Sequence, residues 1–179
     1  MEPKLAAFSD KITQNQPLFA RVQTVYDARE KSGLSAEQQR LAWKVYTDFV
    51  RAGARLDTAG KKRVAEINQR LAALFTLFGQ HVLADENDLF LAIESEADLA
   101  GLPASLRTSA AAEAESRKMP GKWVIRNTRS SVVPFLTWSD RRDLRERAWR
   151  MFVERGDRGG ANDNNAIISE ILALRAERA

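Results

Sequence analysis

The chain has 179 residues, of which 44% are apolar and 29% are charged, and its formal net charge is +4. This composition is ordinary for a globular protein, and the length is sufficient to bury a core. Because the sequence contains no cysteine, it excludes disulfide bonds, a cysteine nucleophile and cysteine-based zinc sites.

A single histidine, His81, limits the catalytic chemistry further. A zinc site usually takes three or four ligands from His, Cys, Asp and Glu. The sequence contains no phosphate-binding loop, no dinucleotide-binding glycine motif and no H-E-x-x-H pair. Carboxylate chemistry remains, but no pair among the 24 acidic residues stands out. We therefore expect no catalytic, cofactor-binding or metal-binding residue in this chain.

The first 85 residues carry four successive helical patterns, which predict antiparallel helices. Residues 4–15 form a short candidate helix, and Pro17 suits the first turn of the next one. Ser35, followed three residues later by Gln38, predicts a capping box that opens a third helix. Leu41, Val45, Phe49 and Ala52 line one face of this helix at spacings of four and three.

The fourth predicted helix is the longest, running from a cap at Asp57 to about Leu83. Its length would be about 40 Å at 1.5 Å per residue. Apolar residues recur along it at intervals of three and four: Val64, Ile67, Leu71, Leu74 and Phe78. His81 falls on the next step of this seam. We interpret it as a histidine at the end of a core stripe, hydrogen-bonded or reaching solvent, since a ligand or base would lack companions nearby in sequence.

Between residues 86 and 138 the pattern predicts short strands mixed with helix. Residues 89–93 are a short apolar run typical of a buried strand, and residues 122–126 alternate like a second strand. An Ala-rich helix begins at Pro103. Residues 131–136 are predicted as a weaker strand, which their proline would confine to a sheet edge.

Residues 139–179 predict two more helices. The first has Leu144, Ala148, Met151 and Phe152 on its inner face. The second begins after a polar run at 162–164 and carries Ile167, Ile168, Ile171, Leu172 and Leu174. No Gly, Asn or Pro stop signal follows Arg175, so we expect this helix to be truncated. The predicted fold class is therefore mainly α: a helical bundle-like segment with a small β element of about two or three short strands in the middle.

The densest basic stretch, residues 140–158, contains seven arginines but also five acidic residues. Mixed charges at helical spacing are typical of a solvated, ion-paired face rather than of a nucleic-acid interface. No run of 18 apolar residues is present, so we expect no membrane partner. Cytoplasm is the default expectation for its location.

A set of short motifs recurs in a defined order along the chain. Near the C-terminus these are V-E-R-G-D at 153–157, N-D-N at 162–164 and I-I-x-E-I-L-A-L-R at 167–175. Upstream they are 3–7 with Asp10, 18–20, 25–26, 48–56, 67–71, 78–84, 98–103 and 121–125. In this order they resemble the zinc oligopeptidase family, which includes thimet oligopeptidase and the bacterial peptidyl-dipeptidases. The resemblance covers nearly the whole chain, and the peptidyl-dipeptidase branch is the more similar one.

The resemblance implies a large, nearly all-helical shell around a deep channel with zinc at its floor. The family's catalytic signature is an H-E-x-x-H helix with a downstream Glu, and neither is present here, so no family site residue can be assigned to this chain. We therefore expect residues 1–179 to be part of the N-terminal, noncatalytic helical region of a larger zinc metallopeptidase, forming part of the channel wall and inactive alone.

The partners that this resemblance implies are the missing catalytic half and, for the parent, short peptide substrates; zinc is expected in the parent only. We also expect truncation to allow self-association through the last helix or the segments around Phe90 and Val124. The alternative is an independent helical interaction module without catalysis. A basic nucleic-acid binder is a third hypothesis, which the mixed charge disfavours.

Overall fold

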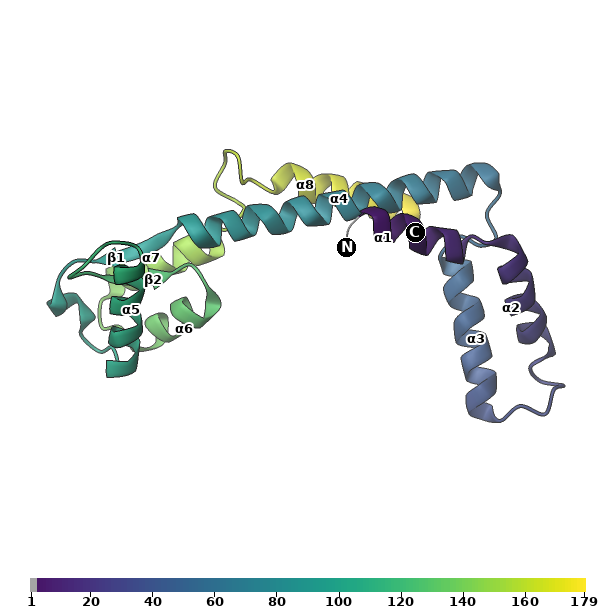
Figure 1. The fold of residues 1–179 in the computed structure, drawn as a ribbon, viewed down its shortest axis with the longest axis horizontal. Coiled ribbons are helices and arrows are strands. Elements are labelled where there is room, and N and C mark those ends of the chain that lie inside the picture. Colours follow the sequence, from purple (N-terminus) through teal and green to yellow (C-terminus); the bar gives the residue numbers. More distant parts are fainter. Residues whose placement is uncertain (1–2) are drawn as a thin grey trace. The chain divides into compact units, whose positions relative to one another are not determined.

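The computed structural model describes residues 3–179, and it confirms a mainly α fold with one small two-stranded sheet. The elements in chain order (Figure 1) are α1 (Pro3–Thr13), α2 (Gln16–Ala28), α3 (Ala36–Arg51), α4 (Thr58–Asp88), β1 (Phe90–Ile93), the 3-10 helix η1 (Glu96–Leu99), α5 (Ala104–Ser116), β2 (Trp123–Arg126), α6 (Arg129–Trp138), α7 (Arg142–Val153) and α8 (Asn165–Arg178).

The chain divides into two compact units. Unit 1 contains the residues up to Thr76 together with 169–179, and unit 2 contains residues 77–168. Each unit is described by itself. No helix within residues 3–179 is both long enough and apolar enough to cross a lipid bilayer.

In unit 1, the polar residues before α2, α3 and α4 satisfy the first backbone N–H groups of these helices. Asn15 accepts a hydrogen bond from the N–H of Leu18 at 2.9 Å. The predicted capping box of α3 is confirmed, because Ser35 and Gln38 each accept a hydrogen bond from the other's backbone N–H. Asp57 accepts from the N–H at position 60 at 2.7 Å. These caps are local, which explains why the sequence predicts them.

Stacked aromatic rings hold α2 against α3. The rings of Tyr26 and Tyr46 lie 4.0 Å apart and nearly parallel, and Phe19 stacks 5.8 Å from Tyr46. This stacking sets the rotation of α3 and turns Leu41 away from the core, since Leu41 lies about 140° around the helix from Tyr46. Leu41 is therefore 59% exposed, although it shares one face of the helix with the half-buried Val45 and Phe49.

The predicted seam of α4 is confirmed in its central part. Ile67, Leu71 and Leu74 are buried, at 2–3% exposure, whereas Phe75 beside them is 46% exposed. Spacings of four and three place the three buried side chains on one face of the helix. This face supplies the core of unit 1 along α4.

Unit 2 has its core around the two-stranded antiparallel sheet, in which Leu91 pairs with Ile125. The strands predicted at residues 89–93 and 122–126 are confirmed. Helices α5 and α6 contact β2, and α7 contacts β1. The fully buried side chains at the centre include Ile125, Val132 and Phe135. Val124, which we expected near a surface exposed by truncation, is 1% exposed and so is not available there.

The third predicted strand, residues 131–136, is wrong, because these residues belong to α6. Pro134 lies inside this helix and removes one backbone hydrogen bond, which usually opposes helix. However, Val132 and Phe135 are both completely buried, and their spacing of three residues matches a helix rather than a strand. Tertiary packing therefore outweighs the local cost of the proline.

Candidate functional site

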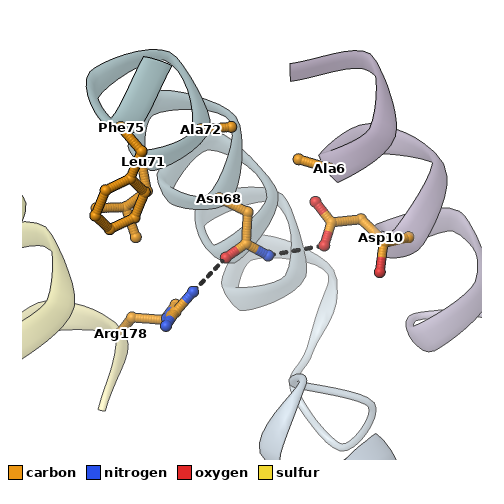
Figure 2. Close-up of a pocket in the computed structure, with 8 residues that line it drawn as sticks. Ala6, Asp10, Asn68, Leu71, Ala72, Phe75 and Arg178 are labelled. Carbon is orange, nitrogen blue, oxygen red and sulfur yellow. Dashed lines mark hydrogen bonds between the residues drawn. The ribbon is translucent and has the colours of Figure 1, made fainter. Parts of the chain in front are cut away.

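A hollow of about 340 Å³ lies in unit 1, where α1, α4 and α8 meet (Figure 2). Its wall is mostly apolar, and three of its polar side chains, one from each helix, are joined by hydrogen bonds. The lining residues are Ala6, Ser9, Asp10, Asn68, Leu71, Ala72, Phe75 and Arg178. Because Asp10 and Asn68 belong to motifs singled out in the sequence, the hollow is the first candidate site of this chain.

The three polar side chains form a line of hydrogen bonds. The amide nitrogen of Asn68 donates to Asp10 Oδ1 at 2.7 Å, and Arg178 Nη1 donates to the amide oxygen of Asn68 at 3.0 Å. Asn68 thus uses both ends of its amide to join α1 to α8 (Figure 2). The other carboxylate oxygen of Asp10, Oδ2, is buried and has no hydrogen-bond partner among residues 3–179.

Burial raises the pKa of Asp10, while the hydrogen bond from Asn68 and the charge of Arg178 act in the opposite direction. Desolvation is the largest of these effects because one carboxylate oxygen lies away from water without a donor. A buried acceptor without a partner is costly, so this oxygen is the natural contact for an added N–H or O–H group. The network can bind and position a polar group.

Two arginine–glutamate pairs join α4 to α8 beside the hollow. Arg70 contacts Glu170 through two hydrogen bonds of 2.6 and 2.7 Å, and Arg63 contacts Glu177 through two of 2.6 and 2.8 Å. Each hydrogen-bonded guanidinium lowers the pKa of its glutamate. These pairs are exposed to solvent, so their contribution is geometric, a fixed register between the helices, more than energetic.

A second polar cluster lies in unit 2 and holds the loop after α7. Asp85, which is 5% exposed, accepts hydrogen bonds from the backbone N–H of Gly156 at 2.8 Å and from the Asn162 side chain at 2.9 Å. Its backbone carbonyl accepts from the Asn127 amide at 3.2 Å. The R-G-D and N-D-N motifs of the sequence are thus brought to the end of α4 by one buried carboxylate.

His81 lies in the same cluster. Its Nδ1 is 2.9 Å from Oδ1 of Asn164, whose amide nitrogen donates to the carbonyl of Phe78 at 3.4 Å. The interpretation of His81 as a hydrogen-bonded residue at the end of the core stripe is confirmed. Within the described part of the chain, no three His, Cys, Asp or Glu side chains lie close enough together to hold a metal ion.

Sequence reasoning assigned no role to Asp85. Its partners lie 71 and 77 residues away, and only the fold brings them together. The available signal was indirect: an acidic residue at the end of an apolar seam, and a Gly- and Asn-rich loop that needs acceptors for its N–H groups. The sequence places Asp10 and Asn68 in two of the ordered motifs but does not predict their contact.

No protein-family model matches the chain. The chain is 33% identical over 176 residues to the dipeptidyl carboxypeptidase of Escherichia coli (strain K12), covering 98% of this chain and 26% of that protein. It is 29% identical over 181 residues to oligopeptidase A of the same organism, covering 99% of this chain and 26% of the relative. It is 28% identical to the organellar oligopeptidase A of Arabidopsis thaliana, covering 100% of this chain and 23% of that protein.

The chain therefore spans about a quarter of the length of the curated relatives that it matches. These matches confirm the resemblance expected from the ordered motifs, and they cover nearly the whole chain.

Proposed function

Since this chain is homologous, over nearly its whole length, to one quarter of the dipeptidyl carboxypeptidases and oligopeptidases A, we propose that it is a noncatalytic helical part of a larger oligopeptidase. The coverage carries this proposal: most of each relative lies outside the matched segment. The proposed substrates of the larger protein are short peptides, from which it removes C-terminal dipeptides. A cytoplasmic location is part of the proposal, supported by a relative from Arabidopsis thaliana named as a probable cytosolic oligopeptidase A.

Zinc in such an enzyme would need ligands from outside residues 3–179. The one histidine of the chain, His81, is hydrogen-bonded to Asn164, and no His, Cys, Asp or Glu cluster in this segment suits a metal ion. The residues present do not fit the metal, so no step of the reaction is assigned to them.

The role proposed for this segment is that of a wall that limits access to a peptide-sized channel. A wall must keep its shape, and the contacts of unit 1 suit that task. Asn68 joins α1 to α8, and two Arg–Glu pairs join α4 to α8. These cross-links favour one arrangement of the three helices, which is the requirement for excluding folded substrates by size.

The proposed partner is the remainder of the longer protein. On α1, Leu5, Phe8 and Ile12 are 57%, 62% and 43% exposed, and their spacing of three and four places them on one face. A contiguous apolar face marks a surface that another protein segment covers. The face therefore supports burial of α1 against the catalytic part of the enzyme.

The direct test is to express the full source gene and this chain separately and assay both with a blocked oligopeptide. We expect the full protein to release C-terminal dipeptides in a reaction that chelators inhibit, and an H-E-x-x-H motif within about 400 codons downstream, on the scale of a few domains. The chain alone should release none. Turnover by the chain alone, or the absence of the motif from the gene, would contradict the proposal.

An independent helical interaction module is the second candidate. The fully buried core of unit 2, centred on Val132 and Phe135, supports it, because a unit with its own core can fold without a larger enzyme. A source gene that ends near this segment and lacks the zinc motif would favour the module.

A further inference from the structure

Strand β1 has an unpaired edge. Within residues 3–179 the sheet has only two strands, so β2 is the sole strand beside β1. In an antiparallel pair, alternate residues direct their N–H and C=O groups toward the partner, and the others direct them outward. The outward groups of β1 have no backbone hydrogen-bond partner in the described chain. Such an edge is a template for another extended segment.

Two hollows border this edge. One, of about 300 Å³, is lined by Phe90 and Leu91 together with Arg147 of α7. The other, of about 470 Å³, is lined by Phe90, Ala92 and Ile93, again with Arg147. Successive residues of a strand point to opposite faces, so a hollow lined by both Phe90 and Leu91 must open at the edge. Leu91 and Ile93 are only 3% and 2% exposed, so the accessible part of the edge lies at the half-buried Phe90 and Ala92.

Arg147 places an uncompensated positive charge beside the edge. It is exposed and has no ion-pair or hydrogen-bond partner in residues 3–179, whereas its neighbours Arg150 and Arg158 are paired with glutamates of α7 and its C-cap. Since Arg147 borders both hollows, a group bound at either would meet its guanidinium. A carboxylate is the group that an unpaired guanidinium binds best.

Phe90 adds an apolar surface at the same edge. Its ring is half-buried, and the guanidinium of Arg117 lies over it, 4.6 Å from the centroid. The ring is thus held in place from one side, while it lines both hollows. An apolar side chain of an added strand would pack against it.

We propose that the edge of β1 binds an extended acidic peptide, which adds to the sheet as a third strand and places a carboxylate against Arg147. Four residues of strand span about 13 Å, so the bound segment has four or five residues. Backbone hydrogen bonds would supply affinity and Arg147 the preference for acidic residues, as in other strand-addition sites. This binding does not depend on whether the longer protein is a zinc peptidase.

Charge argues for a peptide rather than for a second copy of this chain. If β1 of one copy paired with β1 of another, the two Arg147 side chains would lie beside the same short interface. The acidic residues that line the second hollow, Glu94 and Asp98, are already paired with Lys122 and Arg141. Like charges brought together in this way oppose association. An acidic peptide instead neutralises the guanidinium.

The test uses the 179-residue chain and fluorescence anisotropy with labelled, terminally blocked pentapeptides. The probe is acetyl-Thr-Val-Glu-Val-Thr-amide, its charge-reversed counterpart has Lys at the centre, and a third peptide carries N-methyl groups that block alternate backbone donors. We expect saturable binding of the Glu peptide below about 1 mM. The Lys peptide should bind up to about fivefold more weakly, since one exposed ion pair contributes up to about 1 kcal/mol, and the N-methylated peptide should bind more weakly because it lacks backbone donors.

Two variants distinguish binding at this site from nonspecific attraction to the positive charge of the helix. Arg147→Gln should weaken the Glu peptide about fivefold and remove its advantage over the Lys peptide. Arg142→Gln, an exposed arginine of the same helix that lines neither hollow, should leave binding unchanged. The proposal is overturned if the Glu peptide does not bind at about 1 mM, if both variants weaken it equally, or if the unaltered chain dimerises through β1 in place of binding the peptide.

Discussion

Asn68 donates a 2.7 Å hydrogen bond to Asp10 Oδ1, and the second carboxylate oxygen of Asp10 remains buried without a donor. Asn68 of α4 thus contacts a carboxyl group of α1 whose burial disfavours its charged form. The raised pKa of Asp10 makes this contact measurable through the pH dependence of folding.

For Asp10→Asn, the stability difference from the parent chain should change with pH. A carboxyl whose folded-state pKa is raised contributes stability that is fully present below the unfolded value of 3.8 and is lost as pH rises through the folded pKa. The variant lacks this loss. Urea unfolding at a series of pH values should therefore show that the free energy of unfolding of the variant increases relative to that of the parent chain as the pH rises from below 3.8. A difference that is independent of pH would contradict the assignment.

Replacing Leu71 by Ala should lower the free energy of unfolding by about 2–5 kcal/mol, because Leu71 is 3% exposed and its removal leaves a cavity. Phe75→Ala is the matched control on the same helix. Phe75 is 46% exposed, so its loss should cost less than half as much as that of Leu71. Thermal or urea unfolding distinguishes the two, and equal costs would show that the buried face of α4 is assigned incorrectly.

Asp85→Asn should destabilise unit 2 by about 1–3 kcal/mol. The carboxylate accepts hydrogen bonds on both oxygens, from Gly156 and Asn162, and an amide can accept on only one. Hydrogen exchange at the Gly156 amide should accelerate along with the loss of stability. Asp88→Asn, at the exposed end of the same helix, is the control and should change stability by less than about 0.5 kcal/mol.

Gly101→Ala should be far more costly than Gly121→Ala. Both glycines have positive φ, +82° and +77°, so the backbone strain of about 1–2 kcal/mol is common to both. A Cβ at Gly101 would lie 2.2 Å from the carbonyl oxygen of Trp138, whereas a Cβ at Gly121 meets nothing within 4 Å. We expect Gly101→Ala to cost at least about 2 kcal/mol more in unfolding measurements. Similar costs would mean that the turn relaxes around the added methyl.

The parts of the fold that sequence predicted are those with local causes. The capping box at Ser35, the cap at Asp57 and the seam through Leu71 depend on residues within one or two turns of helix. The strand at 90–93 followed from a short apolar run. The exposure of Leu41 on α3 does not follow from its spacing, because the stacking of Tyr26 on Tyr46 orients this helix and those rings come from different helices.

The error at α6 has a similar origin. Pro134 and the β-branched residues before it favour a strand locally, and only the packing of Val132 and Phe135 in the core of unit 2 reverses that preference. The polar clusters were beyond local reasoning for the same reason: Asp10 meets Asn68 across 58 residues, and Asp85 meets Gly156 across 71. Sequence could suggest such residues but could not pair them.

The division of the chain has a consequence for how this protein can vary. Unit 1 is assembled from two separate stretches, up to Thr76 and from Ser169 onward, while unit 2 is one uninterrupted stretch between them. His81 and Asn164, near the two ends of unit 2, are hydrogen-bonded at 2.9 Å, so those ends lie close together. A module whose ends meet can be exchanged as one piece: a single change in the gene can replace residues 77–168, provided that the new segment also completes α4 and α8, which both continue into unit 2.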